Sequence, residues 1–508
     1  MSTASFPLTP EQSAAVEMAL TGRDCVIEAL AGTGKTSTLV AIAEAIQAAD
    51  PTRRVLYLAL NKSIVTDAEG RFPSNTECRT AHGLANRAVA GPYRHRIGKG
   101  GRMKSTELAA MLRAEAVTIV LKSGSRRFAG AFLAGMAKRT VARWCYTSST
   151  TIEPEHMPLP EIDAEDGREF LAIRAEFAKA VLPLARRYWD DVCNPRGRLP
   201  FEHDHYLKMY QLQGAVVEAD VILYDEAQDA NGCMSAIVAD QVHAQRIYVG
   251  DTYQQIYEWR GAVNAIASFE GERTWLTQSF RFGPEIAGCA DLVLAGLGAE
   301  VHLLGNPAKP GVVRMIVDPD AAVDAVLCRT NAEAIATILR ALDAGLRPAL
   351  VGGTWQIEAM IRAAADLKAG RGTQHPELAC FANWGEVQDY AENDACGIEL
   401  AGFVRLVDGY GTDKLSDVLA RCSSSEASAD LIVSTAHKAK GREWPRVRIA
   451  GDFPTDDGKG RPMTTEDRRL LYVAATRARE LLDVADCAFL RDRAADSAAA
   501  AMLGPVSS

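Results

Sequence analysis

The segment at residues 29–36, Ala-Leu-Ala-Gly-Thr-Gly-Lys-Thr, constrains the fold of this chain more than any other. An apolar run at residues 25–27 precedes it, and residues 37–49, rich in Ala and Ile, follow it. The first run predicts a buried strand, and the second predicts a helix. A glycine-containing turn between a strand and a helix is typical of domains with a parallel sheet, so we expect an α/β fold.

The same turn predicts a phosphate site. Backbone N–H groups at a helix start carry partial positive charge, and Gly32 and Gly34 let the backbone approach phosphates closely. Lys35 would reach the β and γ phosphates, and the Thr36 hydroxyl would bind Mg²⁺. The alternative is a chance glycine-rich turn, since Ala29 stands where the usual pattern has its first glycine. The residues expected to bind ATP are Ala31, Gly32, Thr33, Gly34, Lys35, Thr36 and Ser37.

A second apolar run, at residues 221–224, ends in the sequence Asp-Glu-Ala-Gln-Asp at residues 225–229. Parallel sheets place ligand sites at the carboxyl ends of their strands. Mg²⁺ is commonly held by one or two carboxylates together with phosphate oxygens, so we expect Asp225 to bind the metal. We expect Glu226 to hold and polarise the attacking water. The alternative is a solvated acidic turn.

A third apolar run, at residues 246–249, leads into residues 250–261, which contain Gln254, Tyr257 and Trp259. An amide at this place can sense a γ phosphate. Flat aromatic rings can stack on unpaired bases, which contributes about 1–3 kcal/mol per base. The alternative for both rings is ordinary packing in the core or on the surface.

The C-terminal half repeats the pattern of strands and helices. Short apolar runs, with helical patterns between several of them, predict a second α/β layer system. Arg281 and Arg477 belong to this half, whereas Lys35 and Glu226 belong to the first. The runs lie at residues 312–317, 325–329, 348–352, 431–435 and 447–450.

Together, these motifs resemble those of superfamily 1 DNA helicases of the UvrD/Rep/PcrA type. Further matching segments lie at 8–12 (Leu-Thr-Pro-Glu-Gln), 61–62 (Asn-Lys), 80–83 (Thr-Ala-His-Gly), 278–281 (Gln-Ser-Phe-Arg), 435–443 (Thr-Ala-His-Lys-Ala-Lys-Gly-Arg-Glu) and 470–478 (Leu-Leu-Tyr-Val-Ala-Ala-Thr-Arg-Ala). The chain is most similar to the helicase portion of the eukaryotic F-box DNA helicases, without the F-box. Two places depart from the family pattern: Ala59 and Leu60 replace an aromatic residue, and Arg442 replaces a leucine.

The resemblance implies two RecA-like P-loop NTPase domains with parallel sheets, each with an inserted, mainly helical subdomain. It implies that Gln12 reads adenine, that Phe280 stacks on it and that Glu443 binds the ribose. Arg281 and Arg477 would meet the γ phosphate, Arg477 as an arginine finger. The expected catalytic residues are Lys35, Asp225, Glu226, Gln254, Arg281 and Arg477. The expected DNA-binding residues are Asn61, Lys62, Thr80, His82, Tyr257, Trp259, Arg260, Thr435 and His437.

The motif order also predicts domain boundaries. The second insertion is short for the family. The expected divisions are 1–85 with 201–275 for the first RecA-like domain, 86–200 for a basic DNA-binding insertion, 276–353 with 430–493 for the second RecA-like domain, 354–429 for a reduced second insertion, and 494–508 for a tail.

The distribution of charge favours a nucleic-acid partner although the net charge is −9. Residues 86–148 contain thirteen Lys or Arg against two acids, a local charge of +11. Local phosphate-facing charge of this kind dominates affinity for nucleic acid. The alternative is a solvated basic helical face.

The resemblance thus implies an ATP-dependent 3′-to-5′ helicase or translocase on single-stranded DNA, in repair, recombination or replication. The expected partners are single-stranded DNA, single-strand/double-strand junctions, and recombinase filaments or other DNA-bound proteins. Alternatives are a protein-displacing translocase that unwinds weakly and a nucleotide-gated DNA-binding scaffold. The 11 scattered cysteines indicate a reducing compartment, so we expect a cytoplasmic, DNA-associated protein. We expect no membrane partner, since no run approaches ~18 apolar residues.

Overall fold

The computed structural model describes residues 7–59, 62–98, 103–121, 124–159, 167–257, 263–267, 269–318, 322–373, 375, 378, 381, 383–393, 398–455 and 462–503. The chain forms two compact units. The first comprises Met1–Ala29 and Lys35–Leu276, and the second comprises Leu30–Gly34 and Thr277–Ser508. The glycine-rich turn therefore groups with the second unit, although the helix that follows it belongs to the first.

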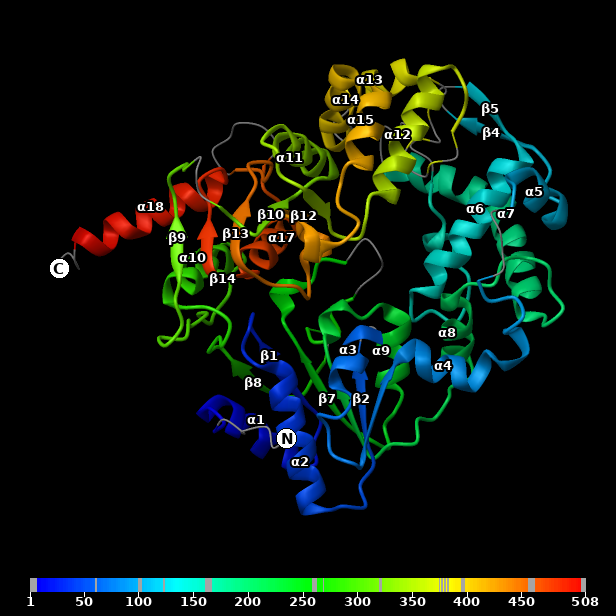
Figure 1. Ribbon diagram of the computed structural model, residues 1–508. Coiled ribbons are helices and arrows are strands. Elements are labelled where there is room, and N and C mark those ends of the chain that lie inside the picture. The colour runs from blue at the N-terminus through cyan, green and yellow to red at the C-terminus, as the bar shows by residue number, and fades with distance from the viewer. Residues whose placement is uncertain are drawn as a thin grey trace. The chain divides into compact units, whose positions relative to one another are not determined.

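The first unit contains a parallel sheet with the strand order β3-β2-β6-β7-β1-β8 (Figure 1). The central strands are buried on both faces, as expected of a parallel sheet covered by helices. In β1, Val26 joins one apolar cluster, whereas Cys25 and Ile27 join the cluster on the opposite face. The strands are β1 (Cys25–Ala29), β2 (Val55–Ala59), β3 (Thr76–Thr80), β6 (Val221–Tyr224), β7 (Gln245–Gly250) and β8 (Glu272–Leu276).

Helices follow most of these strands. The helix predicted at residues 37–49 begins two residues earlier, at Lys35. The helices and short 3₁₀ turns around the sheet are α1 (Pro10–Leu20), α2 (Lys35–Ala49), α3 (Lys62–Ala68), α4 (Ala81–Val89), α8 (His203–Leu212), η3 (Ala227–Asp229), α9 (Gly232–Ala239) and η4 (Thr252–Gln254).

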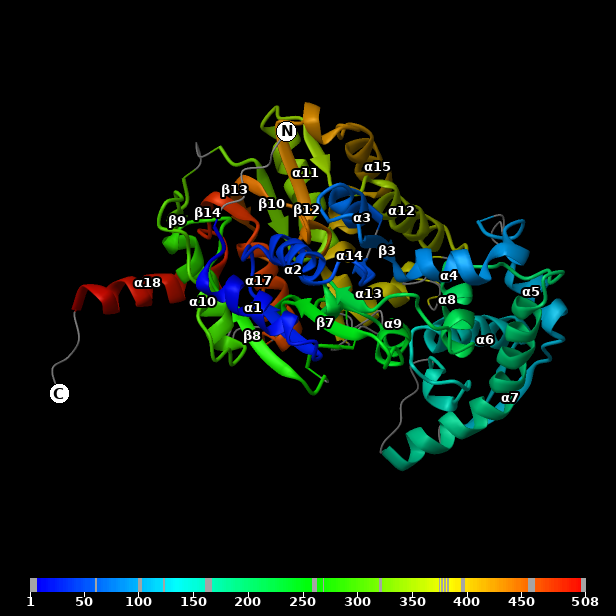
Figure 2. The same ribbon diagram turned by 90° about the horizontal axis from the view of Figure 1, so that it is seen from below.

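A helical group is inserted into the first unit between α4 and α8. It contains α5 (Ser105–Leu112), α6 (Gly130–Cys145) and α7 (Gly167–Cys193), and α6 and α7 lie side by side in both ribbon views (Figures 1 and 2). An antiparallel hairpin of β4 (Val117–Leu121) and β5 (Gly124–Phe128) accompanies these helices. This group is thus mainly helical, as expected, but its hairpin was not predicted.

The second unit also contains a parallel sheet, with the order β11-β12-β10-β13-β14-β9. Its strands are β9 (Val312–Arg314), β10 (Ala325–Cys328), β11 (Pro348–Leu350), β12 (Leu431–Thr435), β13 (Trp444–Ile449) and β14 (Ala478–Asp483). Its helices are α10 (Pro284–Gly296), α11 (Asn331–Asp343), α12 (Trp355–Lys368), α13 (Trp384–Asn393), α14 (Ile398–Tyr410), α15 (Thr412–Ala420), α16 (Ala436–Ala439), α17 (Thr465–Ala475) and α18 (Ala488–Leu503).

The two parallel sheets confirm the predicted α/β fold class with two layer systems. One expected strand was too long, because the run at 312–317 ends as a strand at Arg314, and Ile316 is 80% exposed. Within the ranges that the structure describes, no helix is long and apolar enough to cross a membrane.

Candidate functional site

The glycine-rich turn has the backbone geometry that its sequence predicts. Gly32 and Gly34 have φ values of +75° and +80°, which residues with a Cβ rarely adopt. A Cβ on Gly32 would also lie 2.5 Å from Ser279 Oγ. The Thr33 hydroxyl donates to the Leu30 carbonyl at 2.8 Å and closes the turn. The turn ends where α2 begins at Lys35, and the first N–H groups of a helix lack intrahelical acceptors.

Two backbone contacts hold this turn within the second unit. The Phe280 N–H donates to the Gly32 carbonyl at 2.8 Å, and the Ala31 N–H donates to the Tyr472 hydroxyl at 3.1 Å. Sequence reasoning did not single out Tyr472, although it lies in the quoted segment at 470–478.

Gln12, the expected adenine reader, is buried and already hydrogen-bonded. Its Oε1 accepts the Thr9 N–H at 3.1 Å in a capping box at the start of α1. Its Nε2 donates to the Thr38 hydroxyl of α2 at 3.1 Å. Gln12 therefore fixes α1 against α2, and its contact with adenine stays a prediction.

At the end of β6, Asp225 is fully buried and held by two hydrogen bonds. The Tyr57 hydroxyl donates to Asp225 Oδ2 at 2.6 Å, and the Glu226 N–H donates to Asp225 Oδ1 at 2.9 Å. Burial and the neighbouring Glu226 raise the pKa of Asp225 to about 6. A bound Mg²⁺ would favour the charged carboxylate, so the donor set fits the predicted metal ligand.

Glu226 adopts an unusual backbone conformation, with φ +52° and ψ 39°. Among the described non-glycine residues, only Arg113 shares a positive φ. This conformation costs about 1 kcal/mol and is typically retained where it aims a functional side chain. The Glu226 carboxylate lies 3.6 Å from Lys35 Nζ. The structure thus brings together the predicted phosphate-binding lysine and the predicted water-polarising glutamate.

The predicted γ-phosphate sensor, Gln254, lies in η4 and is buried. Its Nε2 donates to the carboxylate of Asp251, which also accepts the Tyr253 N–H at 3.0 Å. The Asp251 N–H in turn donates to Gln228 Oε1 at 3.1 Å. Sequence reasoning assigned no role to Asp251 or to Gln228. The sequence signal that could have identified them is their position, because each lies within four residues of the end of a buried strand.

In the second unit, Arg281 and Glu443 form an ion pair. Arg281 Nε donates to Glu443 Oε2 at 2.7 Å, and another guanidinium nitrogen donates to the Thr476 carbonyl at 2.9 Å. Arg477 is buried and donates to the Val473 carbonyl at 2.8 Å. Residues from three separate predicted motifs therefore meet here, and the side chain of the neighbouring Phe280 remains 40% exposed.

Two of the predicted DNA-binding segments share the tripeptide Thr-Ala-His at a turn from strand to helix. Thr80 caps α4 by accepting the Gly83 N–H at 2.9 Å, and Thr435 occupies the corresponding place before α16. His82 Nε2 lies 3.1 Å from Asp204 Oδ1. Hydrogen bonds from His82 and from Tyr146 hold the pKa of Asp204 below its usual range against the effect of burial.

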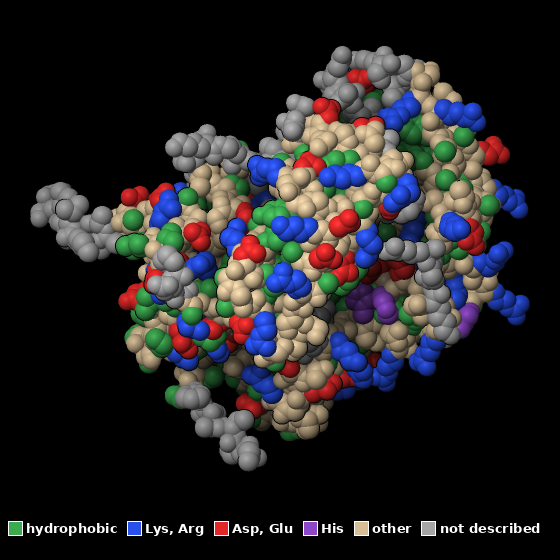
Figure 3. Space-filling view, turned by 45° about the horizontal axis from the view of Figure 1, so that its top comes forward, with side chains coloured by type: hydrophobic (Ala, Val, Ile, Leu, Met, Phe, Trp, Pro, Cys, Tyr) green, Lys and Arg blue, Asp and Glu red, His purple; other side chains and the backbone are tan. Residues whose placement is uncertain are grey.

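The remaining predicted DNA-binding residues are only partly described. Lys62 is exposed at the start of α3, and Tyr257 is half-buried. Asn61, Trp259 and Arg260 lie outside the described residues, so their contacts stay predictions. Figure 3 shows many Lys and Arg side chains on the right of the view, where Figure 1 places the helical group of α5 to α7.

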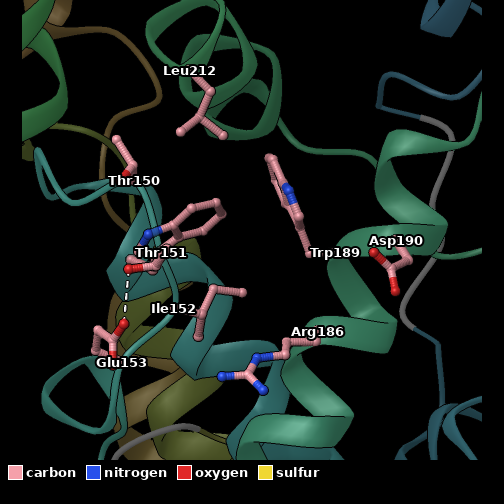
Figure 4. Close-up of a pocket in the computed structure, with 9 residues that line it drawn as sticks. Thr150, Thr151, Ile152, Glu153, Arg186, Trp189, Asp190 and Leu212 are labelled. Atoms are coloured by element: carbon pink, nitrogen blue, oxygen red, sulfur yellow. Dashed lines mark hydrogen bonds between the residues drawn. The ribbon is translucent and has the colours of Figure 1, made fainter.

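A cavity of about 380 Å³ lies in the first unit among α6, α7, α8 and the loop at 150–153 (Figure 4). Trp189 and Arg186 come from α7, and Ile152 and Leu212 also line it. None of its lining residues is a predicted site residue. This cavity is therefore distinct from the strand-end site of Lys35, Asp225 and Glu226.

Comparisons with known proteins agree with the order of these motifs. A family model described as "AAA domain" matches residues 12–260, and one described as "UvrD-like helicase C-terminal domain" matches residues 430–484. The chain is 30% identical over 522 residues to F-box DNA helicase protein 1 of Schizosaccharomyces pombe, covering 94% of the chain and 57% of that protein. It is 30% identical over 503 residues to F-box DNA helicase 1 of Gallus gallus, covering 91% of the chain and 47% of that protein. The chain thus spans about half the length of these curated relatives.

Proposed function

Because the chain belongs to the UvrD-like helicase family, we propose that it is an ATP-dependent DNA helicase that moves 3′ to 5′ on single-stranded DNA. The observation that carries this proposal is the strand-end group of Lys35, Asp225 and Glu226. A lysine that follows a glycine-rich turn, together with two adjacent carboxylates, supplies the groups that hydrolysis of ATP requires.

In this proposal, Thr36 and Asp225 hold Mg²⁺, which neutralises phosphate charge when bound. Lys35 binds the β and γ phosphates, and Glu226 accepts a proton from the attacking water. Gln254 senses the γ phosphate.

The second unit supplies the remaining nucleotide contacts in this proposal. Arg281 and Arg477 stabilise the charge on the transferred phosphoryl group, as arginine fingers do in other phosphoryl-transfer enzymes. Phe280 and Glu443 hold the nucleoside together with Gln12 of the first unit. Support comes from the cluster that joins Arg281, Glu443 and the carbonyl of Thr476.

We further propose that loss of the γ phosphate changes the attraction of these arginines for the nucleotide and so drives movement along DNA. The DNA track would include Lys62, Tyr257 and the two Thr-Ala-His turns at 80–82 and 435–437. The proposed process is DNA repair, recombination or replication, and the proposed substrates are single-strand/double-strand junctions. We propose that the protein is cytoplasmic and associated with DNA. Recombinase filaments or other DNA-bound proteins are the proposed protein partners.

A strand-displacement assay tests polarity and unwinding together. Partial duplexes with either a 3′ or a 5′ single-stranded overhang are mixed with the protein, ATP and Mg²⁺. We expect displacement from the 3′-overhang duplex alone. Displacement from the 5′-overhang duplex alone would reverse the proposed polarity. Hydrolysis of ATP without strand displacement from either duplex would indicate translocation without unwinding. Removal of DNA-bound proteins would then be the proposed activity.

A further inference from the structure

One buried amide connects the predicted catalytic glutamate to the loop of the predicted γ-phosphate sensor. Gln228 is fully buried in the turn after β6. Its Nε2 donates to Glu226 Oε2 at 2.5 Å and lies 3.5 Å from Asp229 Oδ2. Its Oε1 accepts the Asp251 N–H at 3.1 Å. The amide therefore joins Glu226, after β6, to Asp251, after the neighbouring strand β7.

The connection continues from Asp251 to Gln254. The Asp251 carboxylate accepts a hydrogen bond from Gln254 Nε2 and caps η4 through the Tyr253 N–H. We call the path Glu226–Gln228–Asp251–Gln254 the amide bridge. All four residues belong to the first unit.

A glutamine is well suited to this place because its amide offers a donor and an acceptor at once. A carboxylate at position 228 would keep the acceptor for Asp251 but lose the donor to Glu226. The space is also closed, since a Cβ on Gly250 would lie 2.0 Å from Gln228 Oε1. The Gln228 side chain is thus held in one orientation by the backbone of β7.

The Gln228 amide would help to hold the Glu226 carboxylate when a nucleotide binds. The Glu226 carboxylate faces both Lys35, at 3.6 Å, and Gln228. A bound triphosphate would draw the Lys35 ammonium to its phosphates, because charge-assisted contacts to phosphate are strong. The hydrogen bond from Gln228 Nε2 holds the Glu226 carboxylate independently of Lys35.

We infer that Gln228 is a positioning residue that aims Glu226 at the attacking water and ties its position to the Gln254 loop. This inference rests on the proposed function and deepens it, since it names the route from the γ-phosphate sensor to the catalytic base. Gln228 touches neither nucleotide nor water in this account, and it acts through Glu226.

The test is steady-state ATP hydrolysis by Gln228→Met, which keeps the side-chain volume and removes both hydrogen bonds. A hydrogen bond to a charged group predicts a fall in DNA-stimulated kcat of about 10- to 100-fold, with KM for ATP within about twofold of wild type. Gly250→Ala, which pushes the amide from the β7 side, should lower kcat in the same way.

Gln241→Met is the matched control. Gln241 is another buried glutamine of the first unit, and it donates to the Ala215 and Ile237 carbonyls and accepts the Val217 N–H. Its loss should lower the thermal unfolding temperature without changing kcat. Circular dichroism on all variants confirms that they are folded.

The inference would be overturned by a kcat of Gln228→Met within about twofold of wild type, or by an equal loss of kcat in Gln241→Met. A rise in KM at unchanged kcat would also overturn it, since it would place Gln228 in nucleotide binding. Failure of the wild-type protein to hydrolyse ATP would instead contradict the proposed function itself.

Discussion

At the end of β6 the first unit holds two acids, Asp225 and Glu226, and Glu226 lies beside Lys35. The second unit instead holds two arginines, Arg281, which pairs with Glu443, and the buried Arg477. The acids are fixed by side-chain hydrogen bonds from Tyr57 and Gln228. The arginines donate largely to backbone carbonyls.

This difference is consistent with different roles for the carboxylates of the first unit and the arginines of the second. Carboxylates that bind a metal and orient water need fixed positions, and neighbouring side chains of the same unit supply them. Guanidinium groups form strong, directional contacts with phosphate, so Arg281 and Arg477 could exchange their present acceptors for a phosphate.

Lys35→Ala should abolish ATP turnover, because it removes the cation expected to bind the β and γ phosphates. Phosphate release in the presence of single-stranded DNA measures the ATP turnover of this variant. Lys179→Ala is the control, since this exposed lysine of α7 pairs only with Glu176 of its own helix in the described structure. Retained DNA-stimulated hydrolysis in Lys35→Ala would remove the lysine from the site.

Arg477→Ala should lower turnover by about 10³–10⁵-fold, the usual range for loss of an arginine finger. Rapid-quench measurement of the hydrolysis step checks this value. Arg347→Ala, which removes an exposed ion pair with Asp430 in the same unit, should leave turnover unchanged. A loss of less than about tenfold in Arg477→Ala would leave that arginine a structural role.

Glu226→Gln should lower turnover by about 10²–10⁴-fold while ATP binding is retained, since the amide cannot accept the proton from water. Binding of a fluorescent ATP analogue and phosphate release separate the two effects. Loss of binding would instead show that the carboxylate supports the turn through Lys35.

His82→Ala and His437→Ala compare the two Thr-Ala-His turns. Each should weaken binding of single-stranded DNA by about fivefold, the effect of one ordinary hydrogen bond. Fluorescence anisotropy with a labelled oligonucleotide measures both. Unchanged affinity in both variants would remove the turns from the DNA track, and an effect in one alone would limit the track to that unit.

The centre of each sheet could be predicted from the sequence. Buried parallel strands such as β1 and β6 are continuous apolar runs, and the predicted run at 221–224 coincides with β6. Of the strands in the two parallel sheets, three were missed, namely β3, β8 and β14. The first two are edge strands with partly exposed side chains, so their sequences, Thr-Glu-Cys-Arg-Thr and Glu-Arg-Thr-Trp-Leu, carry no apolar run.

The site was predictable where a motif is contiguous and not where partners come from different strands. Lys35 and Glu226 followed from their motifs. The roles of Gln228 and Asp251 depend on β6 lying next to β7, and that neighbour relation is absent from the local sequence. Asp204 was missed for the same reason, since it reaches His82 from α8.

We propose that this chain couples binding of single-stranded DNA to hydrolysis of ATP at the Lys35–Glu226 site. This coupling is tested most directly by steady-state phosphate release from the wild-type protein, with and without single-stranded DNA. We expect hydrolysis that requires Mg²⁺ and increases when DNA is added. Tight binding of ATP with no hydrolysis under either condition would contradict it.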